Sequence, residues 1–103
     1  MLVKVVGVTW YRPEEYKTMM AMFEDGADFP DTYEGWLSNA THGLKRLKSQ
    51  GLPYEKAILG PQTFPDFCRQ FNLKMNSDGR AAFAANYVRL LHENGVLHPS
   101  SKN

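Results

Sequence analysis

The segment DTYEGWLSNATHGLKRLKSQGLP, residues 31–53, is the most regular helical pattern in this sequence of 103 residues. Asp31 and Glu34 stand three apart, as in a capping box in which aspartate replaces serine or threonine. Gly51 and Pro53 are typical of a helix end. The apolar residues between them keep one helical register over four turns: Tyr33, Trp36, Leu37, Ala40, Leu44 and Leu47. The pattern predicts an amphipathic helix between Asp31 and Gly51.

Three more helices are expected around this one. The first opens at Pro13 and ends near residue 24, and its apolar stripe is Tyr16, Met19, Met20 and Phe23. Thr63 and Asp66 frame the start of a third helix. Its inward side is predicted to hold Phe64, Phe67, Cys68 and Phe71. A fourth ends at Asn94-Gly95 and is predicted to turn Phe83, Tyr87, Leu90 and Leu91 inward.

Two short strands complete the expected fold. Residues 2–8 are rich in valine, and residues 54–59 lie between Pro53 and Gly60-Pro61. The predicted class is therefore α+β and helix-dominated, in the order βααβαα, with one domain over residues 1–95 and a flexible tail over 96–103. Two strands alone make a marginal sheet. A homodimer that pairs strands across a two-fold axis is a hypothesis that would give four.

Composition and charge bear on partners and location. A net charge of +1 from 12 basic and 11 acidic residues supplies no overall field that favours DNA or anionic lipid. Cys68 is the single cysteine, so an internal disulfide is impossible and a reducing compartment is indicated. No run of residues is apolar enough for a membrane span, and no secretory signal is seen. We expect a cytoplasmic protein without membrane contact.

The residues that commonly carry catalysis or metal binding form no motif. Cys68 shares a helical face with phenylalanines, which favours a buried thiol over a nucleophile. The histidines are His42, His92 and His98, and their spacing matches no zinc site. The acidic residues of 24–31 do not have the spacing of a calcium loop. We therefore expect no metal and no cofactor.

The basic run His42 to Lys48 leaves two interpretations open. Its cations complement the negative end of the helix dipole, which is a local role. Alternatively, together with base stacking on Trp10 or Tyr11 beside Arg12, it would suit a nucleic acid strand.

Arg80 also leaves two readings open, because it lies in the first turn of the fourth helix, where a cation meets the positive end of the dipole. Either its side chain is solvated, or it faces an anion or a carboxylate such as Asp66 or Asp31.

The stretch VTWYRPEEY, residues 8–16, is rich in aromatic rings. Trp10 and Tyr11 are adjacent, and neighbouring residues of an extended segment face opposite ways. We therefore expect at most one of the two to be buried. The exposed ring would edge a pocket or interface together with Tyr33 and Trp36. Core packing of these rings is the favoured interpretation, because aromatic residues at helical spacing are usually structural.

The motifs WYRPEEY, PDTYEGWL, FPDFCRQFNL and SDGRAAFA, taken together, resemble an uncharacterised family of small bacterial cytosolic proteins. The resemblance covers residues 5 to 85. The matching positions are Trp10, Tyr11, Tyr16, Tyr33, Trp36, Leu37, Phe64, Cys68, Arg80 and Phe83. It implies a bacterial cytosolic source and no particular activity.

The leading functional hypothesis is a non-catalytic binding or adaptor protein with a protein partner. Its candidate binding residues are Trp10, Tyr11, Arg12, Tyr33, Trp36 and Arg80. A nucleic-acid-associated module that uses the basic end of the second helix is one alternative. A small enzyme with an unrecognised site is another.

Overall fold

The computed structural model describes residues 4–95, and the predicted tail over 96–103 lies outside these residues. Two strands, β1 (Val6–Trp10) and β2 (Tyr54–Ile58), form a parallel pair. The order of elements is βααβαα, so the predicted α+β class is confirmed. Parallel strands need a long crossover, which α1 (Tyr16–Met22) and α2 (Tyr33–Ser49) provide. The chain then continues through α3 (Thr63–Gln70) and α4 (Ser77–Glu93).

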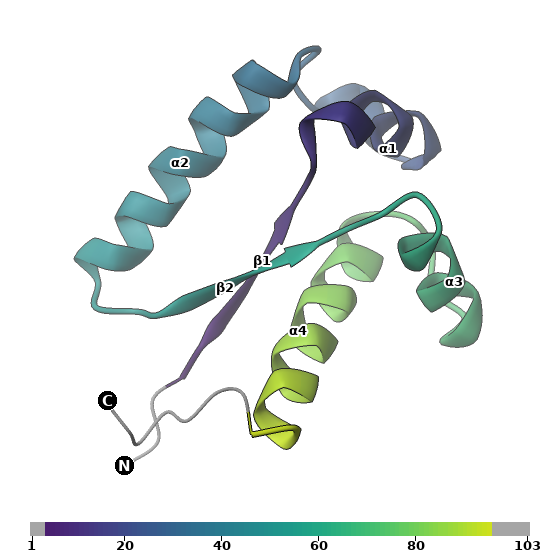
Figure 1. Ribbon diagram of the computed structural model, residues 1–103. Helices are drawn as coiled ribbons and strands as arrows, with labels where there is room; N and C mark the ends of the chain where they lie inside the picture. Colours follow the sequence, from purple (N-terminus) through teal and green to yellow (C-terminus); the bar gives the residue numbers. More distant parts are fainter. Residues whose placement is uncertain (1–3, 96–103) are drawn as a thin grey trace.

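The strands lie between α2 and α4, which cover opposite sides (Figure 1). Side chains alternate along a strand, so Gly7 and Thr9 face α4 whereas Val8 and Trp10 face α2. Gly7 permits close packing of α4. A methyl group added at Gly7 would come within 2.6 Å of the backbone oxygen of Ala84.

Several expected boundaries are corrected. The first strand was expected over residues 2–8, but β1 extends to Trp10, because Leu59 donates a backbone hydrogen bond of 3.0 Å to the oxygen of Trp10. The cap of α2 is Thr32 rather than Asp31, since the Thr32 hydroxyl accepts a hydrogen bond from the Gly35 amide at 3.0 Å. Thr63 is the first residue of α3 and not its cap.

Helix ends also explain two residues that were predicted to face inward and do not. α3 has eight residues and ends at Gln70, so Phe71 falls beyond its last turn and is 50% exposed. Leu90 is 42% exposed, on the last turns of α4. The stripe of the first helix is confirmed in the main, because Tyr16, Met19 and Phe23 are all buried.

Short 3-10 turns connect the elements around α1. The turn η1 (Pro13–Glu15) leads into α1, and η2 (Gly26–Asp28) follows it. The backbone amide of Glu24 donates to the oxygen of Met75 at 2.9 Å, which joins the end of α1 to the loop before α4. The first and second halves of the chain are therefore linked near the carboxyl end of β1.

Candidate functional site

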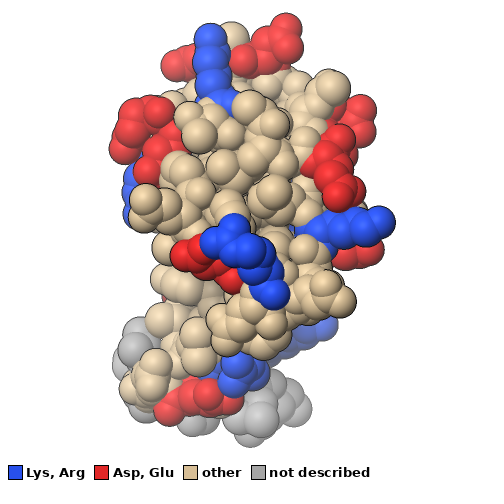
Figure 2. Space-filling model, turned by 90° about the vertical axis from the view of Figure 1, so that its right-hand side faces the viewer, with Lys and Arg blue, Asp and Glu red and all other residues tan. Residues whose placement is uncertain are grey.

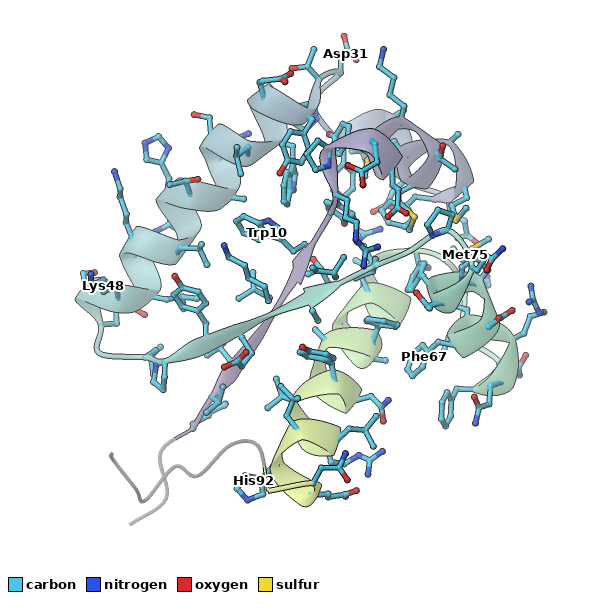
Figure 3. All side chains as sticks on the ribbon, viewed as in Figure 1. Trp10, Asp31, Lys48, Phe67, Met75 and His92 are labelled. Atoms are coloured by element: carbon cyan, nitrogen blue, oxygen red, sulfur yellow. The ribbon has the colours of Figure 1, made fainter. Side chains whose placement is uncertain are left out.

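The predicted aromatic surface is part of the core. Trp10 is 9% exposed and Tyr11 is 1% exposed, so the expectation that at most one of them is buried was wrong. Both rings pack edge to face against Trp36, with centroid distances of 4.8 and 4.9 Å. The alternation of side chains along a strand did not predict this, because Tyr11 lies past the end of β1. There α1 and the loop after it cover the Tyr11 ring. Figure 3 shows Trp10 between the strands and α2.

Tyr11 is the least ordinary member of this cluster. Its ring contacts Tyr16, Phe23 and Phe29, and its hydroxyl oxygen is buried with no hydrogen-bond partner among the described residues. Burial raises the pKa of Tyr11 to about 12, although the nearby charge of Arg80 and the Thr9 hydroxyl act in the opposite direction. The hydroxyl therefore stays protonated at neutral pH.

Arg80 is paired with a carboxylate that the sequence did not suggest. Its two terminal nitrogens donate to the two oxygens of Asp25 at 2.8 and 2.7 Å. The guanidinium carbon lies 4.7 Å from the centroid of Phe23 and 4.9 Å from that of Phe29, within the range of cation–π attraction. This hydrogen bonding from Arg80 lowers the pKa of Asp25. The carboxylate partner of Arg80 is therefore Asp25, and neither Asp66 nor Asp31. The guanidinium of Arg80 is held by this ion pair within the fold.

The remaining candidate binding residues divide between surface and core. Tyr33 is partly buried against Tyr16 and Trp36. Arg12 is exposed and forms a 3.0 Å ion pair with Glu15. Arg12 and Glu15 line an open cleft of about 450 Å³ at the carboxyl ends of the strands, with Ile58 and residues 60–63. Of the predicted site, only Arg12 presents its charge to solvent.

The thiol and the possible metal ligands show structural roles. Cys68 is buried against the core, and burial raises the pKa of its thiol. A nucleophilic cysteine needs the opposite shift. Within residues 4–95, no group of three or more histidine, cysteine, aspartate or glutamate side chains is placed to hold a metal ion.

The basic run is exposed on the second half of α2. His42, Lys45, Arg46 and Lys48 all reach solvent. Lys48 lies at the end of α2 that is distant from Asp31 (Figure 3). The cations complement the last turn of the helix, as expected from the dipole. On the side of the molecule that Figure 2 shows, acidic and basic side chains are interspersed.

An apolar groove between α3 and α4 is the surface that the sequence pattern missed. It has a volume of about 360 Å³. Its lining consists of Phe67, Phe71, Leu73, Ala82, Ala85, Asn86 and Arg89. Figure 3 shows Phe67 between the two helices. The ring centroids of Phe67 and Phe71 are 4.8 Å apart, and of the two rings Phe71 is half exposed whereas Phe67 is partly buried against the core.

The geometry of the chain after α3 explains why Phe71 is exposed. Asn72 adopts a positive φ of 55°, and the amide of Leu73 donates to the oxygen of Cys68 at 2.8 Å. This is the Schellman arrangement, which ends a helix at a left-handed residue. Asparagine tolerates that conformation better than most residues. Asn72 was therefore the available signal that α3 stops before completing its predicted stripe.

Comparisons with known proteins leave the fold and the groove to be interpreted from their own chemistry. No family model, no curated protein and no solved structure matches the chain. In residues 4–95, no helix is both long enough and apolar enough to cross a membrane.

Proposed function

We propose that the protein is a small non-catalytic binding or adaptor protein, and that the α3–α4 groove receives an apolar segment of a partner protein. The observation that carries this proposal is the 50% exposure of Phe71 beside Phe67 in a shallow, largely apolar surface. Aromatic residues and arginine are enriched where protein interfaces gain most of their affinity. Exposed apolar surface with a polar rim is typical of docking sites.

The polar rim indicates the chemistry of the partner. Arg89 lies at the groove and donates to Glu93 at 2.7 Å on an exposed face of α4. An exposed pair at this spacing contributes only about 0.3–0.5 kcal/mol, so Arg89 can exchange Glu93 for an incoming carboxylate at little cost. The partner is therefore a segment with a bulky apolar side chain next to an acidic residue. A helix laid between α3 and α4 would present both.

A bacterial cytosolic setting belongs to the same proposal. The resemblance to small bacterial proteins supports it, and so does a single cysteine that is buried as a thiol.

Photocrosslinking tests the groove in cells of the source organism. With p-benzoylphenylalanine in place of Phe71, we expect crosslinks to one dominant protein that mass spectrometry can identify. The matched control places the same residue at Leu90, which is 42% exposed on α4 and is not part of the groove lining. Equal crosslinking from both positions would contradict the proposal.

Affinity measurements with the purified crosslinked protein complete this test. Phe71→Ser should raise the Kd by about tenfold or more, the equivalent of about 1.4 kcal/mol, whereas Leu90→Ser should leave it unchanged. Because Phe71 is half exposed, its replacement should not unfold the chain. Unchanged affinity of the Phe71→Ser variant would remove the groove as the docking site.

Nucleic acid binding is the second candidate function, and the exposed cations of α2 favour it. It predicts an affinity for single-stranded oligonucleotides that falls steeply with salt. The replacement of Lys45 and Arg46 by Ala would then abolish binding. An affinity for the crosslinked protein that is insensitive to salt would favour the groove instead.

A further inference from the structure

One edge of the two-stranded sheet has unpaired backbone groups. Val6 donates to the oxygen of Pro53 at 2.9 Å, and Leu59 donates to the oxygen of Trp10 at 3.0 Å. In a parallel pair, every second residue of a strand directs its N–H and C=O groups toward the same neighbouring strand. Because Pro53 and Leu59 bond to β1, the backbone groups of the odd-numbered residues of β2 face β1. The N–H and C=O groups of Tyr54, Lys56 and Ile58 therefore point away from β1. Within residues 4–95, none of them has a hydrogen-bond partner.

The side chains of this edge are also available. Ile58 is 40% exposed, Lys56 is exposed and Tyr54 is half-buried. All three lie on the side of the sheet that Trp10 occupies. On the opposite side, α4 packs more closely against β1 than against β2, and so it leaves the outer part of β2 less covered.

The charged group of Lys56 is directed away from the outer edge of β2. A lysine on an edge strand commonly prevents pairing with another chain. Here the ammonium nitrogen of Lys56 lies 4.3 Å from the ring centroid of Trp10, which belongs to β1. The lysine therefore extends across the sheet toward β1, and its cation–π contact keeps the positive charge off the outer edge.

We propose that β2 pairs with β2 of a second copy of this chain, antiparallel across a two-fold axis that passes beside Lys56. In this register Tyr54 lies opposite Ile58 of the partner subunit, and Lys56 lies opposite its own symmetry mate. Each of these opposed pairs exchanges two backbone hydrogen bonds. The result is a four-stranded sheet in the order β1-β2-β2-β1.

Self-complementarity favours a second copy over a different partner. A two-fold axis places the aromatic ring of Tyr54 against the β-branched side chain of Ile58 twice, and such cross-strand pairs are favourable. The pairing covers one of the exposed large apolar residues, Ile58. It also extends a two-stranded sheet, which is marginal by itself, to four strands.

Light scattering and sedimentation equilibrium test the pairing on the full chain. The wild-type protein should have twice the 11.7 kDa mass of one chain, and Ile58→Lys should raise the dimer Kd by about tenfold or more. The matched control is Leu90→Lys, since Leu90 is as exposed as Ile58 and lies on α4 away from the edge. A wild-type mass of one chain at about 1 mM would overturn the proposal.

Backbone variants separate this edge from the rest of the molecule. Lys56→Pro removes an outward amide of β2 and no bond to β1, and it should give a monomer. Thr9→Pro removes an outward amide of β1 and should leave the dimer intact. If Lys56→Pro remains dimeric, or if Ile58→Lys leaves the dimer Kd unchanged, then the dimer uses another surface and the proposal is wrong.

Amide hydrogen exchange keeps the proposal testable even if a variant fails to fold. In the wild-type protein, the amides of Tyr54, Lys56 and Ile58 should exchange slowly when the chain is dimeric and rapidly after dilution. Rapid exchange of the Lys56 amide in a sample of dimeric mass would overturn the pairing. Phe71→Ser should not change the mass, so failure of the α3–α4 groove and failure of this edge are distinguishable.

Discussion

The hydroxyl of Tyr11 costs stability, because a buried polar atom without a partner loses its hydration and gains nothing in return. The hydroxyl of Tyr16 is the natural comparison, since it donates to the backbone oxygen of Pro30 at 2.6 Å. The two tyrosines are neighbours in the same cluster, with ring centroids 6.0 Å apart. Both rings are 1% exposed, so replacing each tyrosine by phenylalanine compares a hydroxyl that has a hydrogen bond with one that has none.

Tyr11→Phe should leave the free energy of unfolding unchanged or raise it by about 1 kcal/mol, since it removes the unsatisfied hydroxyl. Tyr16→Phe should lower it by about 1 kcal/mol, because the Pro30 oxygen loses its donor. Urea denaturation of the three proteins measures both differences. A loss of stability in Tyr11→Phe equal to that in Tyr16→Phe would mean that the Tyr11 hydroxyl is satisfied in solution.

The ion pair between Asp25 and Arg80 gives stability a defined pH dependence. Arg80 lowers the pKa of Asp25 in the folded chain below that of the unfolded chain, which is about 3.9. The unfolded state therefore binds the proton first as the pH falls. The contribution of the pair is complete above the unfolded pKa and is lost as the pH falls through the lower folded pKa.

Asp25→Asn should lower the free energy of unfolding by about 1.5–3 kcal/mol at pH 7, the usual range for hydrogen bonds to charged groups. The difference from wild type should shrink as the pH falls below about 4, because the carboxylate of the unfolded wild-type chain is protonated first and that of the folded chain at lower pH. Thermal unfolding between pH 2 and pH 7 measures it. Asp31→Asn, on an exposed residue, is the control and should have little effect. A constant difference across this range would contradict the assignment.

At the scale of the helices, Gly43 and Gly79 have the same helical propensity but differ in how tightly they are packed. Gly43 in α2 has open space where a methyl group would lie. Gly79 in α4 is buried, and a methyl group there would lie too close to the backbone oxygen of Lys74. Both positions are helical, so propensity alone predicts the same gain from alanine.

Gly43→Ala should raise the free energy of unfolding by about 0.5–1 kcal/mol, because alanine loses less backbone entropy on folding. Gly79→Ala should lower it, since the loop at Lys74 must move away from α4. Calorimetry of both variants checks the signs. Equal stabilisation would show that the loop before α4 yields at no cost.

Helix boundaries show what a sequence pattern can and cannot predict at this scale. The apolar repeat of α2 and the stop signals after it placed that helix correctly, because both depend on neighbours along the chain. The choice between Asp31 and Thr32 as cap depended on which side-chain oxygen reaches the Gly35 amide. The early end of α3 depended on the left-handed conformation of Asn72.

At the scale of the whole molecule, the core and the two proposed interfaces occupy different regions. The core includes Phe64 and Cys68 of α3 as well as residues of β1, α1 and α2. The α3–α4 groove borders it through Phe67 and Leu73, whereas the outer edge of β2 lies elsewhere. Variants at the exposed residues Phe71 and Ile58 should leave the core intact.

The sequence by itself determined the number, order and approximate bounds of the strands and helices, because apolar periodicity, caps and turn residues act over a few neighbouring positions. Only the tertiary structure decided that Trp10 and Tyr11 are both buried, that Asp25 faces Arg80 and that Phe71 is exposed. Asp25 and Arg80 are 55 residues apart, and no local pattern encodes which distant carboxylate a cation meets. Burial depends on which element covers a side chain, and that is determined when the elements pack.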